Sequence, residues 1–318
     1  MTTITGVRTW LNTSGALQIQ STYQIPIDVF SQGLWFEKIS FHENPIKSEY
    51  QGLNANNFEN ILGRVIKRNE PYIRILGRVT PNFLLNVLPA ASGANFSGDT
   101  LGWAVVPKYL SIVFKDNDSA ISEFQVWRFS DCQIIRLILT SESFGELMYE
   151  LFLVPEIFKK EAIIGSTIIV PNTPTDFERF NHRAGQPLVK EPSGSTVNLA
   201  TGKVIFEIIN KVKPHFGPAL FPTQIKAGYT RTRGEVRGRY GNEYKDVRDD
   251  ALAVIYKNFV QKWITASGTK FLQLDLQKVD MDSSPIEAGE NQISPFLGEY
   301  ETFSNLENDP VIITKGGF

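Results

Sequence analysis

Residues 124–154 read FQVWRFSDCQIIRLILTSESFGELMYELFLV, and this stretch decides the fold class. Apolar and polar residues alternate in one run before the Ser/Glu/Gly turn at 141–146 and in another run after it. Alternation with a period of two is typical of half-buried β-strands. The pattern predicts a core β-hairpin, with Trp127 and Phe129 on one face of its first strand and Cys132 on the other.

Similar runs on both sides of this hairpin extend the β pattern. Residues 33–41 alternate before it and Phe271–Leu276 after it, and the aromatic share of 12% favours sheets with cross-strand aromatic pairs. A helix is predicted over Asp246–Thr265, where apolar residues recur at helical spacing, and 82–88 suit either a strand or a short helix. We expect a mainly β protein, built of β-barrel or β-sandwich modules with one or two helices, α+β overall.

The segment 171–202 is the best candidate for a domain boundary. It holds four prolines and three glycines with few apolar residues, a composition typical of linkers and surface excursions. We expect a β-rich barrel or sandwich module over 1–170, this linker over 171–202, and a second α+β module with an acidic C-terminal tail over 203–318. No internal repeat is clear.

Composition narrows the class of protein. With 42% hydrophobic and 21% charged residues, the 318-residue chain resembles ordinary globular proteins. No apolar run approaches the roughly 20 residues of a spanning helix, so we expect no membrane span. A lone Cys132 cannot form an internal disulfide, and residues 1–8 lack the pattern of a secretory signal, so we expect a reducing compartment.

Enzymatic signatures are weak. The histidines lack metal-ligand or triad spacing; they are His42, His182 and His215. Asp176, Glu178 and His182 could supply oxygen and imidazole ligands, but this segment is better interpreted as a solvated loop. Asp280 and Asp282 could hold a hard cation, but they are better interpreted as part of a solvated tail. Cys132 is better interpreted as a small buried apolar residue than as a nucleophile. We therefore expect no catalytic residue, no cofactor and no metal.

Charge is unevenly distributed along the chain. Residues 226–248 hold seven basic residues and three acids, whereas 275–309 hold nine acids and one lysine. Two solvated segments would explain this pattern, and so would complementary docking between neighbouring copies or binding of an anionic ligand.

The basic segment is the most distinctive polar motif, YTRTRGEVRGRY at 229–240. If it is extended, its odd-numbered arginines share a face with Tyr229, and Arg and Tyr are the types that pair with phosphates and stack on bases. An intersubunit contact arm and a plain solvated loop are the alternatives, and an overall pI near 6.0 argues against a broad nucleic-acid footprint. The candidate assembly or nucleic-acid contacts are Lys226, Tyr229, Arg231, Arg233, Arg237, Arg239, Tyr240 and Tyr244.

The hairpin quoted first also carries a family resemblance. Val126–Ile134, a following strand, the Gly-containing turn at 141–147 and a second strand resemble the pattern of bacteriophage tail-tube-like proteins. The resemblance covers about 30 of the 318 residues and leaves 203–318 without a counterpart. It implies a subunit that joins its strands to those of its neighbours in stacked rings around a lumen.

These observations favour a non-enzymatic structural subunit of a self-assembling particle. We expect a phage tail or baseplate component of a virion assembled in the host cytoplasm. Its partners would be copies of itself and other subunits of the particle, joined through sheet edges, the basic arm and the acidic tail. The alternative is a single-stranded nucleic-acid-binding protein that uses the segment 229–244.

Overall fold

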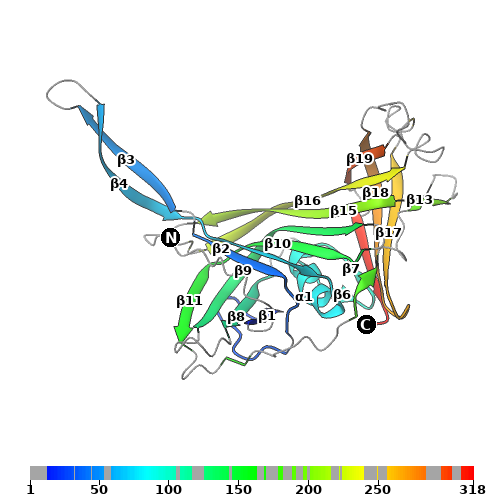
Figure 1. Ribbon diagram of the computed structural model, residues 1–318, viewed down its shortest axis with the longest axis horizontal. Coiled ribbons are helices and arrows are strands. Elements are labelled where there is room, and N and C mark those ends of the chain that lie inside the picture. The colour runs from blue at the N-terminus through cyan, green and yellow to red at the C-terminus, as the bar shows by residue number, and fades with distance from the viewer. Residues whose placement is uncertain are drawn as a thin grey trace.

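The protein is a body of long antiparallel strands from which one β-hairpin projects (Figure 1). This computed structural model describes residues 13–31, 33–43, 45–53, 59–104, 108–116, 125–142, 145–162, 168–169, 178–181, 188–190, 196–198, 201–215, 222, 224–239, 249, 256–283, 295–302 and 309–318. The prediction of a mainly β, α+β protein is confirmed.

Every named strand except β3 and β4 belongs to one sheet. The strands of the first half are β1 Thr13–Ile19, β2 Lys38–His42, β3 Pro45–Leu53, β4 Glu59–Asn69, β5 Tyr72–Arg78, β6 Phe96–Ser97, β7 Thr100–Leu101, β8 Leu110–Asp116, β9 Gln125–Glu142, β10 Met148–Val154 and β11 Ile157–Ala162. Those of the second half are β12 Phe180–Asn181, β13 Leu188–Lys190, β14 Thr196–Asn198, β15 Thr201–His215, β16 Gln224–Arg239, β17 Lys257–Thr265, β18 Phe271–Ser283, β19 Pro295–Thr302 and β20 Val311–Gly316.

The hairpin predicted at 124–154 is confirmed as β9 and β10, which pair antiparallel. Strand β9 is long enough to serve two parts of the sheet. Its first half lies between β8 and β11, and its second half lies between β10 and β15. It therefore connects the two parts of the body.

Two bulges in β9 change which residues face the core. The pairing with β8 shifts register at Ser130 and Asp131, where Asp131 has a φ of 52°, and the pairing with β10 shifts again at Ile135. A bulge adds one residue to a strand and so reverses its alternation. The expectation that Cys132 faces away from Phe129 is therefore wrong, because both side chains are buried in the same core cluster.

The helix α1, Pro81–Ser92, lies against β9 and β1 of the sheet. Thr80 caps its first turn by accepting a hydrogen bond from the Phe83 amide, and Gly93 ends it in the left-handed conformation. The Phe83 ring stacks on Tyr149 of β10 with centroids 3.8 Å apart. Of the two readings of 82–88, the helix is the one that the structure adopts.

The predicted helix at Asp246–Thr265 is wrong over its second half, because 257–265 form strand β17. Most of 246–256 lies outside the described residues. Phe259 and Trp263 are four residues apart, a spacing that fits one helix face but also fits one strand face. Both are buried, as are Gln261 and Thr265 between and beyond them, so the period is two.

The sheet runs continuously across the expected boundary at 171–202. Strand β15 pairs with β9 over seven positions, from Lys203 with Glu142 to Ile209 with Arg136. One core cluster holds side chains from both halves, such as Leu151 and Trp263. The division into two modules stays a prediction. The acidic segment expected as a tail supplies β18 and β19 in its described part.

Candidate assembly surface

The basic segment forms strand β16, which lies between β15 and β19. Tyr229, Arg231, Arg233 and Arg237 are exposed along it, while Thr232 is buried on the opposite face. The predicted shared face of these arginines and Tyr229 is therefore present. Over 233–239 the segment has strand neighbours on both sides, so this part is a sheet strand rather than a free arm.

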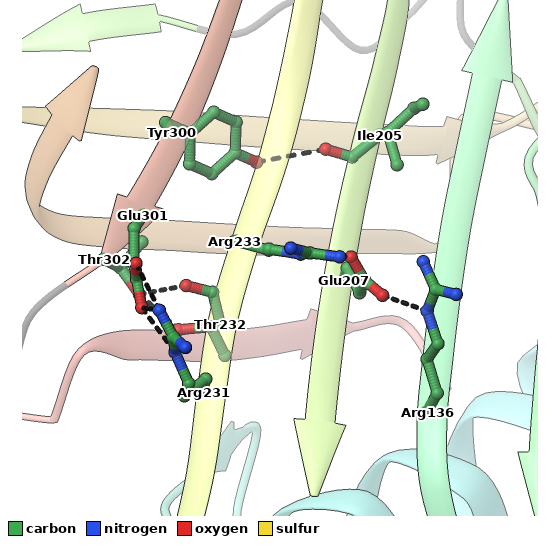
Figure 2. A network of polar contacts seen from close by, with 9 residues as sticks. All are labelled: Arg136, Ile205, Glu207, Arg231, Thr232, Arg233, Tyr300, Glu301 and Thr302. Carbon is green, nitrogen blue, oxygen red and sulfur yellow. Dashed lines mark hydrogen bonds and ion pairs between the residues drawn. The ribbon is translucent and has the colours of Figure 1, made fainter. Parts of the chain in front are cut away.

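Each of the exposed arginines Arg231, Arg233 and Arg237 is paired with a glutamate. Figure 2 shows the pairs of Arg231 and Arg233. Arg231 donates two hydrogen bonds of 2.7 Å to the Glu301 carboxylate of β19, and this contact raises the pKa of the Arg231 guanidinium. Arg233 Nε donates to Glu207 Oε2 at 2.6 Å. Arg237 pairs with Glu235, two residues earlier on the same strand.

Glu207 on β15 is the centre of this network. It is 5% exposed, and its second carboxylate oxygen accepts a hydrogen bond from Arg136 of β9. One buried carboxylate thus joins two half-exposed guanidinium groups from strands on either side of it (Figure 2). A buried charge needs such partners, so the network fixes these side chains.

The arginine face borders a hollow of about 590 Å³. Its charged lining consists of three arginines and seven carboxylates: Arg136, Arg231, Arg233, Glu150, Glu207, Glu235, Asp280, Asp282, Glu299 and Glu301. The hollow is therefore acidic, and the arginine face lacks the positive electrostatic field expected of a nucleic-acid groove.

Part of this acidity is built into the sheet register. Glu299 of β19 stands directly opposite Asp282 of β18 on one side and Glu235 of β16 on the other. Like charges directly opposite each other destabilise a sheet. Among the described residues no cation forms an ion pair with Asp282 or Glu299, so these two carboxylates add to the acidic lining of the hollow.

Gly234 of β16 has no side chain, and this lets the Tyr300 side chain of β19 extend across β16 to reach β15. Gly234 pairs with Tyr300 of β19, and the Tyr300 hydroxyl donates to the Ile205 carbonyl of β15 at 3.3 Å (Figure 2). A Cβ atom at position 234 would overlap both that carbonyl and the tyrosine. Gly77 and Tyr149 form the same kind of pair in the first half, with Trp35 as the acceptor.

The remaining sequence candidates are placed only in part. Lys226 and Arg239 lie on β16, opposite Lys213 and Pro295, and Tyr240 and Tyr244 lie outside the described residues. Asp176 and His182 also lie outside them.

Cys132, the single cysteine of the chain, is buried in the core. Burial and the neighbouring Asp131 raise the pKa of the Cys132 thiol. No group of three or more His, Cys, Asp or Glu side chains within this part is arranged to hold a metal ion. Its helix is too short to cross a membrane.

The feature that sequence reasoning missed is the projecting hairpin of β3 and β4, here called the arm (Figure 1). It pairs from Pro45 with Asn69 outward to Leu53 with Glu59 and forms a sheet of its own. The Asn-rich composition of 51–60 predicts a loop, whereas residues 51–53 belong to β3 and residues 59–60 belong to β4. No protein-family model matches the chain, and no curated protein is significantly similar to it in sequence.

Proposed function

We propose that this protein is a non-enzymatic structural subunit that assembles with copies of itself, and that the arm is its principal contact element. The observation that carries the proposal is that β3 and β4 form a two-stranded sheet apart from the body (Figure 1). The nine residues of β3 give the arm a reach of about 30 Å.

An isolated two-stranded hairpin is at best marginally stable in water. Both outer edges of the arm carry backbone N–H and C=O groups that only another strand or water can satisfy. A neighbouring sheet edge would satisfy them by β-augmentation, which gives affinity through main-chain hydrogen bonds. The arm on one copy and a different surface on the next make a heterologous contact, and repeated heterologous contacts produce rings or filaments.

We further propose that the particle is a phage tail or baseplate. The support is the resemblance of 124–154 to tail-tube-like proteins together with this mode of contact. In such a particle, the sheet body would form the wall and the arm would reach an adjacent subunit.

The nucleic-acid alternative has less support. Tyr229, Arg231, Arg233 and Arg237 share one exposed face. Each of these three arginines has a glutamate partner, however, and the adjoining hollow is acidic. Phosphates would have to displace these glutamates, which lowers the expected affinity.

The test is to shorten the arm. Ile46 and Arg68 are paired across it, so replacing 47–67 with Asn-Gly closes the hairpin with a favoured two-residue turn. We expect wild-type protein to form rings or tubes in negative-stain images and to gain mass with concentration in light scattering. The shortened variant should remain monomeric while keeping the circular-dichroism spectrum and Tm of the wild type.

A matched variant distinguishes the contribution of the arm to assembly from that of the arginine face. Changing Arg231, Arg233 and Arg237 together to Ala leaves the arm intact, so this variant should still assemble. A wild-type protein that stays monomeric at high concentration, or a shortened variant that assembles as well as the wild type, would overturn the proposal.

A further inference from the structure

A second polar cluster lies at the first bulge of β9, five residues before Arg136 of the acidic hollow. Asp131 is completely buried there, and its Oδ1 accepts hydrogen bonds from the Gln24 amide at 2.8 Å and from Gln20 Nε2 at 3.1 Å. The Asp131 amide in turn donates to Gln20 Oε1 at 2.7 Å. These contacts attach the segment 20–24 to the bulge.

A second buried carboxylate lies near the first. The ladder pairs Gln133 with Val154 and Ser130 with Ile157, so Glu156 lies in the two-residue gap between β10 and β11 that flanks the bulge at Asp131. Glu156 is 8% exposed, and its Oε1 accepts a hydrogen bond from the Tyr23 hydroxyl at 2.6 Å. The Tyr23 ring lies 4.8 Å from that of Tyr109.

Each carboxylate keeps one buried oxygen without a partner. Asp131 Oδ2 and Glu156 Oε2 are inaccessible to solvent and have no hydrogen bond within the described part of the chain. No ion pair joins either residue to a described cation. Two neighbouring buried carboxylates are strongly unfavourable when both are charged, so either a cation neutralises them or one of them holds a proton.

We propose that Asp131 and Glu156 form a binding site for a hard divalent cation of calcium size. Two carboxylates neutralise a divalent ion, and their free oxygens are the ligand type that Ca²⁺ takes. Neutral oxygens from the neighbouring chain or from water complete such a shell in calcium sites. Mg²⁺ suits the site less, because it retains several waters in an octahedral shell.

The cation would act as a clasp between distant segments. Asp131 lies in β9, Glu156 lies at the corner between β10 and β11, and both hold side chains or amides of 20–24. Neutralising the pair would therefore secure this segment against the sheet. The site is separate from the arm and does not depend on assembly.

The experiment uses the full chain after removal of metals with a chelator. Tb³⁺ replaces Ca²⁺ and is excited through nearby tyrosines, so Tyr23 and Tyr109 should sensitise its luminescence. Asp131→Asn and Glu156→Gln remove the charges but keep the oxygens that accept hydrogen bonds from Gln24 and Tyr23. Asn also tolerates the left-handed backbone at 131. Asp282→Asn with Glu299→Gln in the acidic hollow is the matched control.

We expect saturable Tb³⁺ luminescence in the wild type and the control, and Ca²⁺ should displace the Tb³⁺. The luminescence should be at least tenfold lower in Asp131→Asn and in Glu156→Gln, here called the clasp variants. At a hundredfold excess over its dissociation constant, Ca²⁺ should raise the Tm of the wild type by about 4 °C and Mg²⁺ should raise it less. Neither clasp variant should respond to Ca²⁺.

Luminescence that survives both clasp substitutions, or is lost in the control, would overturn the proposal. So would a wild-type Tm that Ca²⁺ does not change. If Ca²⁺ has no effect and Glu156→Gln stabilises the protein at pH 7 but not at pH 4, a shared proton neutralises the pair and the metal site is refuted.

Discussion

Replacing Glu207 with Gln tests the network at the arginine face. This substitution keeps the size of the side chain and removes the charge shared by Arg136 and Arg233. The two arginine side chains are 42% and 51% exposed, so each pair is worth about 0.5–1 kcal/mol after solvent screening. The expected loss in free energy of unfolding is about 1–2 kcal/mol, or a fall in Tm of about 2 °C for a chain of this size.

Equilibrium unfolding in urea measures this loss, and a double-mutant cycle with Arg233→Ala isolates the pair. We expect a coupling energy of about 0.5–1 kcal/mol between positions 207 and 233. Glu299→Gln is the control, because it removes a carboxylate that faces only other carboxylates across its ladder. It should be neutral or stabilising. A Glu207→Gln protein as stable as the wild type, or a coupling energy near zero, would refute the importance of this network.

Three further substitutions or reactions test the fold. Gly234→Ala should lower the free energy of unfolding, measured in urea, by about 2–4 kcal/mol, because the added methyl group overlaps the Ile205 carbonyl and displaces Tyr300. A loss below about 0.5 kcal/mol would contradict the position of Tyr300 across β16. Thr80→Ala should cost about 1 kcal/mol by removing the α1 cap, and Thr80→Ser should restore most of it; equal stabilities would argue against the cap. Burial raises the pKa of the Cys132 thiol, so a thiol reagent at pH 8 should label it only at the rate of unfolding; rapid labelling of the native protein would show an open core.

The mainly β class followed from alternation, but the bulges in β9 could not be read from it. Phe129 and Cys132 are an odd number of positions apart, and only the extra residue at the Ser130–Asp131 bulge brings both into one core. That bulge depends on contacts from Gln20 and Gln24, more than one hundred residues away in sequence. Such a partner is invisible to a local pattern.

Strand β17 shows a second limit. Phe259 and Trp263 satisfy helical and strand spacing alike, and pairing with β18 decides between them. The β-branched residues Val260, Ile264 and Thr265 also favour a strand.

The arginine face was predictable from alternation, whereas its glutamate partners were not. Arg231 meets Glu301 and Arg233 meets Glu207 across strands far apart in the chain. The charge asymmetry between 226–248 and 275–309 fitted two solvated segments, docking between copies or an anionic ligand. The structure places the described parts of both segments on neighbouring strands of one subunit.

Hydrogen exchange of the arm amides tests self-assembly most directly. The amides of β3 and β4 are measured in dilute protein and again at a concentration where light scattering detects oligomers. Arm-mediated assembly predicts that outer-edge amides of 45–53 or 59–69 exchange at least tenfold more slowly in the oligomer, while amides of α1 keep their rates. Unchanged exchange along both arm strands in an assembled sample would contradict it.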